Sequence, residues 1–115
     1  MDKQYVKLRS KGKPFRKVEI TEKVGKYLAI HLTSVQIVDD LIMESMDRYT
    51  ITHIPTGIRF DSLLTLRRAK NLGYLILELI PESILKCRGY KKFQKRVKSE
   101  LPEQDFKRLR KRCGR

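Results

Sequence analysis

Apolar and polar residues alternate over short stretches in the first half of the chain. "KVEI" and "KYLAIHL" are rich in β-branched and aromatic residues, and a polar linker that contains Gly25 separates them. Short segments of this composition, separated by a polar linker, are typical of strands. The pattern therefore predicts strands over residues 17–21 and 26–32.

Residues 35–46 fit two patterns. Behind a Thr/Ser cap, apolar residues recur at helical spacing: Val35, Val38, Leu41, Ile42 and Met46. "VQIV" and "LIMES" also fit extended strands, with a turn at Met46-Asp47 into the alternating "RYTITHI". We favour strands, because the alternating segment needs a partner and a neighbouring hairpin supplies one. The helix stays open as an alternative.

The segment "HIPTGIRF" carries the clearest turn signal. Pro55 has the φ angle expected at the second position of a type I turn, and Gly57 can adopt the left-handed conformation that closes a three-residue hairpin. We therefore predict that strands over residues 48–54 and 58–60 pair antiparallel.

A helix is predicted over residues 62–79, with Asp61 or Ser62 as its N-cap. Its apolar stripe consists of Leu66, Ala69, Leu72, Ile76 and Leu79. Gly73 leaves an alternative open, in which it caps a shorter helix and "YLILELI" forms a buried strand.

Two further helices are predicted near the C-terminus. The first, over residues 90–100, has an apolar stripe of Tyr90, Phe93, Val97 and Leu101. The second, over residues 102–112, starts at a proline and carries acidic residues first and basic residues last. Its stripe is Phe106, Leu109 and Cys113. We expect both stripes to pack on the core, in preference to base stacking by Tyr90 or Phe93.

Together these elements predict the α+β class: a small antiparallel sheet with a β-hairpin around residues 48–60, a core helix and two basic amphipathic C-terminal helices. A length of 115 residues suits one domain. "KLRSKGKPF" lacks apolar periodicity, so residues 1–16 are predicted to be a flexible basic arm. Residues 17–85 form the predicted core, and residues 86–115 a basic helical extension packed on it.

The formal charge of +14 is concentrated at the two ends of the chain. Residues 1–17 carry +6 and residues 82–115 carry +9, whereas residues 18–81 carry −1. A polyanionic partner would relieve the resulting repulsion, while solubility alone is better served by acidic residues. We therefore predict a protein without catalytic activity or cofactor that binds DNA or RNA through its phosphates.

Little sequence specificity is expected, because Gln94 and Gln104 are the only amide side chains in the C-terminal segment that could contact bases bidentately. Both ends of the chain are expected to hold one ligand. The predicted contacts are Lys11, Lys13, Arg16, Arg88, Lys91, Lys92, Lys95, Arg96, Lys98, Lys107, Arg108, Arg110, Lys111 and Arg112.

The same charges fit a second class, a basic protein-interaction factor. Such a factor would be an inhibitor, an adaptor or a peripheral subunit of a nucleoprotein or viral assembly, and a homodimer is left open. A membrane span is not expected, because the most apolar stretch, "LGYLILELI", is too short for one and contains Glu78. Attachment of a basic amphipathic helix to a membrane surface ranks third, because the apolar faces are narrow and are expected to pack internally. The basic first twenty residues lack an apolar leader, so we expect an intracellular protein, cytoplasmic or in the nucleoid or nucleus.

Catalytic and metal-binding patterns are weak. Cys87, Cys113, His31 and His53 occur singly, whereas structural zinc sites take ligands in close pairs. Asp39-Asp40 would point to opposite faces of a strand. Both histidines lie in alternating segments and are predicted to be surface residues of the sheet.

The segment "RYTITHIPTGIRFDSLLTLRRA", residues 48–69, resembles the DNA-binding modules at the front of some phage integrases, which combine a three-stranded sheet with a helix. The resemblance implies a phage or mobile-element protein. It also implies contacts to DNA from the sheet, by Arg48, Thr50, Thr52 and Arg59.

Overall fold

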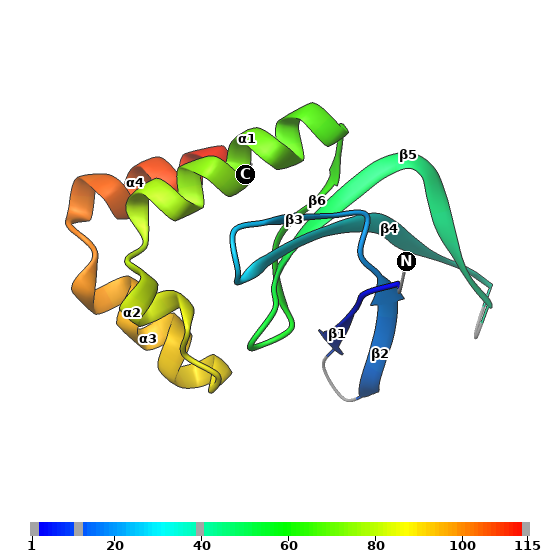
Figure 1. The fold of residues 1–115 in the computed structure, drawn as a ribbon, viewed down its shortest axis with the longest axis horizontal. Helices are drawn as coiled ribbons and strands as arrows, with labels where there is room; N and C mark the ends of the chain where they lie inside the picture. The colour runs from blue at the N-terminus through cyan, green and yellow to red at the C-terminus, as the bar shows by residue number, and fades with distance from the viewer. Residues whose placement is uncertain (1–2, 11–12, 39–40, 114–115) are drawn as a thin grey trace.

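The computed structural model describes the backbone of residues 3–10, 13–38 and 41–113 and the side chains of residues 3–9, 16–33 and 47–113. Within these residues the chain confirms the α+β class, with two antiparallel sheets and four helices (Figure 1). The elements are β1 (Tyr5–Ser10), β2 (Lys13–Glu19), β3 (Glu22–Val24), β4 (Leu28–Val38), β5 (Leu41–His53), β6 (Ile58–Leu64), α1 (Leu66–Leu79), α2 (Glu82–Leu85), α3 (Tyr90–Glu100) and α4 (Glu103–Arg112).

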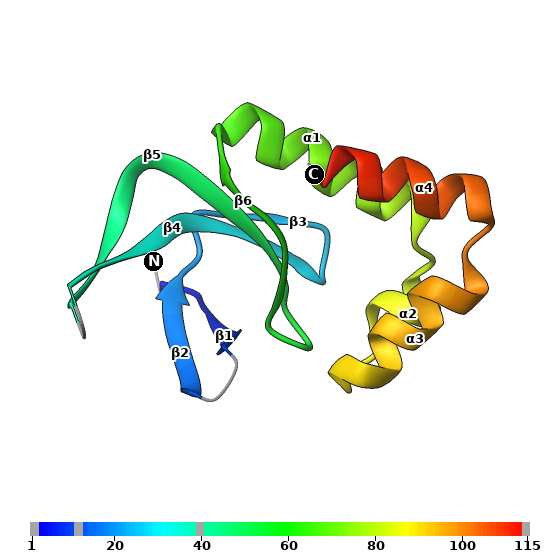
Figure 2. The same cartoon turned by 180° about the vertical axis from the view of Figure 1, so that it is seen from behind.

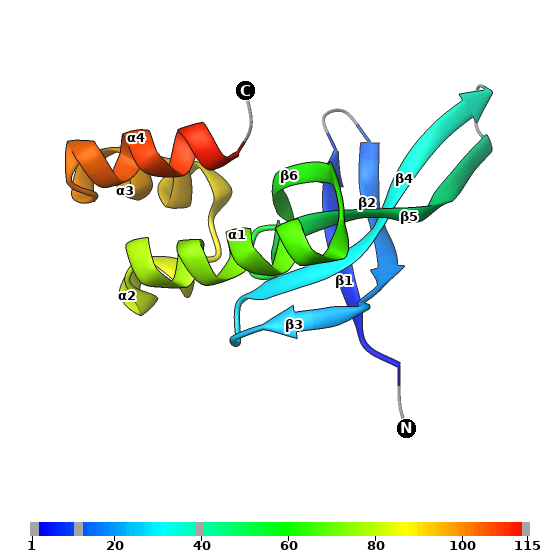
Figure 3. The ribbon, with the colours of Figure 1, turned by 90° about the horizontal axis from the view of Figure 1, so that it is seen from above.

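The larger sheet has the strand order β3-β4-β5-β6, so each strand pairs with its neighbour in the sequence. β1 and β2 form a separate two-stranded sheet, in which Val6 lies opposite Val18 and Leu8 opposite Arg16. The β4–β5 ribbon extends away from the helices (Figure 3). The larger sheet has four strands, whereas the integrase modules considered in the sequence comparison of residues 48–69 have three.

Both faces of the larger sheet are covered, which produces three layers (Figures 1 and 2). Side chains alternate between the faces of a strand. Leu28 and Ile30 of β4 therefore join the core cluster under the helices, whereas Ala29 between them packs against Val6 and Val18 of the β1–β2 pair. The second face of the sheet is thus buried under strands rather than exposed to water.

The helix α1 begins later than predicted. Thr65 caps it by accepting a hydrogen bond from the backbone N–H of Arg68, while residues 58–64 continue as β6, so the predicted N-cap at Asp61 or Ser62 is wrong. Gly73 lies inside the helix. A Cβ there would stand 3.0 Å from both methyl groups of Val24, so the glycine allows α1 to lie close against the sheet.

The C-terminal helices complete the core. Phe93, Val97 and Leu101 are buried, and Leu109 of α4 joins them in the same cluster as α1. α4 packs beside α1, and α3 packs against α2 (Figure 2). α3 spans the residues where the first C-terminal helix was predicted, and α4 starts one residue after the predicted position.

Several predictions for the first half of the chain need correction. The flexible arm over residues 1–16 is wrong for Tyr5–Ser10 and Lys13–Arg16, which form strands because Val6, Leu8 and Val18 pack on the sheet. Residues 35–38 and 41–46 are strands, as favoured. The turn at Met46-Asp47 is wrong, since β5 runs through it, and Asp39 and Asp40 lie outside the described residues.

Candidate nucleic-acid interface

A cavity of about 580 Å³ lies between the β1–β2 pair, the larger sheet and the start of α3. We call it the hairpin pocket. Three arginines line it, each from a different strand: Arg9 from β1, Arg16 from β2 and Arg59 from β6. Its remaining lining residues carry no charged carboxylate: Leu8, His31, Thr33, Thr50, Gly57, Ile58, Tyr90 and Gln94.

The turn between β5 and β6 positions Arg9. The backbone N–H of Arg9 donates to the carbonyl of Gly57 at 3.0 Å, and its Nε donates to the carbonyl of Thr56 at 3.3 Å. The guanidinium carbon lies 4.7 Å from the centre of the Tyr90 ring, which is cation–π distance. Arg9 therefore joins β1, the turn and α3 at the mouth of the pocket.

Arg16 enters the pocket from the inner side of the β1–β2 pair. It lies directly opposite Leu8, which packs on the apolar cluster beneath this pair. Arg59 lies opposite Thr52 in the larger sheet. Among the described residues no ion pair or hydrogen bond engages the guanidinium of Arg16 or Arg59.

Polar groups on the sheet form the floor of the hairpin pocket. The hydroxyls of Thr33 and Thr50 share a hydrogen bond of 2.9 Å, and Thr33 also accepts from the backbone N–H of Leu63. The Nε2 of His31 lies 2.8 Å from the hydroxyl of Thr52. His31, Thr50 and Thr52 are buried, so the expectation that His31 lies on the sheet surface is wrong. Thr52 has no exposed surface for a DNA contact, whereas Thr50 lines the hairpin pocket and can be reached only from inside it.

A second concavity, of about 590 Å³, lies between β6, α3 and α4. We call it the helix groove. Its base is apolar and includes Phe60, Phe93 and Phe106. Its basic lining residues are Arg59, Lys91, Lys95, Lys98 and Arg110. The three lysines recur at spacings of four and three residues, which places them on one side of α3.

The hairpin pocket and the helix groove are adjacent, because Ile58, Arg59 and Gln94 line both. Their basic residues therefore form one surface, which we call the basic band: Arg9, Arg16, Arg59, Lys91, Lys95, Lys98 and Arg110. No Asp or Glu lines either concavity. Two other surface hollows carry both signs of charge: Asp61 lines one together with Lys111 and Arg112, and Glu82 lines the other together with Lys26.

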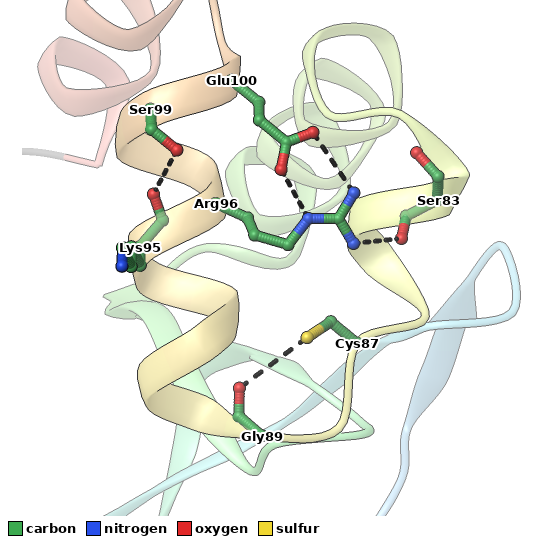
Figure 4. A network of polar contacts seen from close by, with 7 residues as sticks. All are labelled: Ser83, Cys87, Gly89, Lys95, Arg96, Ser99 and Glu100. Carbon is green, nitrogen blue, oxygen red and sulfur yellow. Dashed lines mark hydrogen bonds and ion pairs between the residues drawn. The ribbon is translucent and has the colours of Figure 1, made fainter.

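Arg96 lies outside the basic band and has a structural role (Figure 4). Its guanidinium donates to both carboxylate oxygens of Glu100 and to the backbone carbonyl of Ser83, which ties α3 to α2. The hydrogen bond to Glu100 raises the pKa of Arg96, and the same bond lowers the pKa of the Glu100 carboxyl. Because the guanidinium of Arg96 already donates to the Glu100 carboxylate, it has fewer N–H groups left for a phosphate, and Arg96 is not part of the proposed contact surface.

The other predicted contacts are dispersed. Lys107 pairs with Glu103 one helical turn earlier, at 3.2 Å and in an exposed position. Lys11 lies outside the described residues, and only the backbone of Lys13 is described. Three predicted contacts, Arg88, Lys92 and Arg108, are exposed but do not line the two concavities.

Sequence reasoning missed Arg9 and named Arg59 only through the integrase resemblance. The signal for Arg9 was present, since Val6 and Leu8 alternate with Lys7 and Arg9 as strand residues do. A strand over these residues would be expected to pack Val6 and Leu8 on the sheet, which would place Arg9 close to the sheet as well.

His53 is also buried, so its predicted place on the sheet surface is wrong. Its Nε2–H donates to the carbonyl of Leu85, its Nδ1 accepts from the hydroxyl of Thr56, and its ring stacks on Phe93 with centroids 4.0 Å apart. Burial lowers the pKa of His53, although the hydrogen bond to Leu85 acts in the opposite direction. The neutral ring is therefore built into the contact between sheet and helices.

The lowered pKa predicts a stability loss in acid. As the pH falls, His53 of the unfolded chain takes up a proton near its ordinary pKa of 6.5, before His53 of the folded protein does. The stabilisation by His53 is therefore complete above this pH and is lost as the pH falls toward the folded pKa, by about 1.4 kcal/mol for each unit of separation. Urea unfolding at about pH 7.5 and about pH 5 measures the difference in the free energy of unfolding between the two conditions. A His53→Gln variant should show a smaller pH difference, and an equal one would contradict the prediction.

In the described part of the chain, no group of three or more His, Cys, Asp and Glu side chains is arranged to hold a metal ion. None of the described helices combines the length and the apolar composition that crossing a membrane requires.

Comparison of the chain with protein-family models, with curated proteins and with solved structures gives no significant match.

Proposed function

We propose that the protein binds nucleic acid through its phosphates and that the basic band is the contact surface. The observation that carries this proposal is the lining of two adjoining concavities by seven basic side chains and no carboxylate. Clefts lined by one sign of charge concentrate the field and attract ligands of the opposite charge. Lysine and arginine form charge-assisted hydrogen bonds with phosphate, and a nucleic-acid backbone presents phosphates in a row.

The chemistry of the band fits backbone contact rather than base readout. Of the fourteen contacts predicted from sequence, the band keeps five, and it adds Arg9 and Arg59. The five are Arg16, Lys91, Lys95, Lys98 and Arg110. Gln94 is the only amide side chain that lines the two concavities. Low sequence specificity follows, because base discrimination needs several bidentate groups in fixed positions.

The test measures binding to single- and double-stranded DNA and RNA by fluorescence anisotropy across a series of salt concentrations. The affinity of the wild-type protein should fall steeply with salt. The triple variant Lys91→Gln, Lys95→Gln, Lys98→Gln should reduce the slope of log affinity against log salt by about two to three, because each lost phosphate contact contributes about 0.7 to 0.9.

A matched triple variant, Lys23→Gln, Lys26→Gln, Arg67→Gln, removes the same charge from exposed positions outside the band. Its slope should change by less than about one unit. Equal effects of the two triple variants would show that binding is spread over the whole surface and would contradict the band. Absence of binding at about 50 mM salt would contradict the proposed function itself.

A further inference from the structure

We propose that the hairpin pocket binds the terminal phosphate of a nucleic-acid strand, as a phosphomonoester held by Arg9, Arg16 and Arg59. This inference rests on the proposed function, because the helix groove would then hold the phosphates that follow the terminal one. It adds a defined ligand group and a direction to a surface that otherwise binds phosphates in general.

The charge of the pocket favours a doubly charged group. Arg16 and Arg59 have no carboxylate partner among the described residues, and Arg9 lines the same cavity. A terminal phosphomonoester carries about −1.5 to −2 at neutral pH and presents three oxygens, whereas an internal diester carries one charge. Guanidinium groups pair with such oxygens through two parallel hydrogen bonds. Three arginines therefore match a terminal phosphate better than an internal one.

The floor of the pocket offers one more donor. Thr33 and Thr50 have two hydroxyl protons between them, and their mutual hydrogen bond uses one. Thr33 meets the backbone N–H of Leu63 as an acceptor, so that contact uses neither proton. In the described part of the chain no further acceptor is bonded to the pair, and both residues line the pocket. One hydroxyl proton is thus available to a phosphate oxygen.

The size of the pocket limits what can enter. A cavity of about 580 Å³ lies in the range of small-molecule sites and accommodates a single nucleotide, but it excludes a duplex. The exit leads past Arg59 and Gln94, which the pocket shares with the helix groove. A strand that starts in the pocket would therefore continue along Lys91, Lys95 and Lys98 of α3.

Competition binding with the full chain tests this inference. Unlabelled single-stranded oligonucleotides of one sequence, carrying a 5′-phosphate, a 3′-phosphate or hydroxyls at both ends, compete with one labelled strand. One phosphorylated form should bind on the order of tenfold more tightly than the hydroxyl form, and its identity tells which end is bound. Arg16→Gln should abolish this preference. Lys95→Gln, the control in the helix groove, should weaken all three strands alike and keep it.

Equal affinity of the three strands for the wild-type protein would overturn the inference and leave the proposed function intact. If no strand binds, the proposed function fails. The pocket is then tested separately by titration with a nucleoside monophosphate that carries its phosphate at the 5′ or the 3′ position. Shifts of the backbone amide resonances of Thr33, Thr50 and Arg59 that disappear in Arg16→Gln would support the pocket. No shifts in the wild-type protein would overturn it. Circular dichroism of each variant checks that it is folded.

Discussion

Replacing Phe93 with alanine is expected to lower the free energy of unfolding by about 3–5 kcal/mol, the range for large buried aromatic residues. Only 3% of Phe93 is exposed. Its ring stacks on His53 of β5 and meets Phe60 of β6 edge-on, with centroids 6.2 Å apart. The variant would open a cavity where α3 joins the sheet, and it would also remove the aromatic contacts, which contribute beyond their buried area.

Urea unfolding measures this effect, with two further variants as controls. Gln94→Ala, at the neighbouring exposed position of α3, should change stability by less than about 0.5 kcal/mol. Phe93→Leu should cost less than Phe93→Ala, which keeps the test informative if the alanine variant does not fold. A Phe93→Ala variant that is as stable as wild type but binds single strands more weakly would contradict the core role and indicate base stacking.

Replacing Gly57 with alanine should destabilise the protein by about 2–4 kcal/mol, because it combines backbone strain with a steric clash. Gly57 has φ +75°, which L-residues rarely adopt. A Cβ at this position would stand 2.5 Å from the carbonyl oxygen of Lys7 and 3.1 Å from the backbone nitrogen of Arg9. β1 would have to move away from the turn, and the hydrogen bond from Arg9 to Gly57 would be lost.

The comparison variant is Gly89→Ala, whose Cβ would meet nothing closer than Lys92 at 3.7 Å. As an N-cap change it should cost less than about 1 kcal/mol. Urea unfolding gives the stability of both variants, and hydrogen exchange at the Arg9 amide reports whether β1 has detached. Unchanged protection of that amide in Gly57→Ala would contradict the predicted displacement.

The helical stripes were accessible from sequence because they repeat within one element. Phe93 and Val97 follow each other at helical spacing, and Pro102 marks where α3 gives way to α4. The β1–β2 pair was not found, because seven basic residues among the first seventeen obscured the alternation of Val6 and Leu8. The apolar content of the whole segment is low, although Val6 and Leu8 of β1 and Val18 of β2 suffice to attach the pair to the sheet.

The candidate site depends on that missed layer. Alternation shows that His31 and Thr33 share one face of β4, but it cannot show that another strand pair covers this face. Arg16 was predicted as a phosphate contact on a flexible arm, and the sequence did not show that it lies opposite Leu8 in a strand pair. The contact between Arg9 and Tyr90 joins positions far apart in sequence, so no local pattern could have predicted it.

The sequential strand order of the larger sheet also determines the order in which the chain can assemble. Three residues connect β3 to β4 and four connect β5 to β6, so these strand pairs close short loops and can form early. The helices that cover Leu28, Ile30 and Ile51 come from later parts of the chain. During synthesis the sheet is therefore complete before its cover exists, and the nascent protein exposes an apolar surface until α1 and α3 emerge.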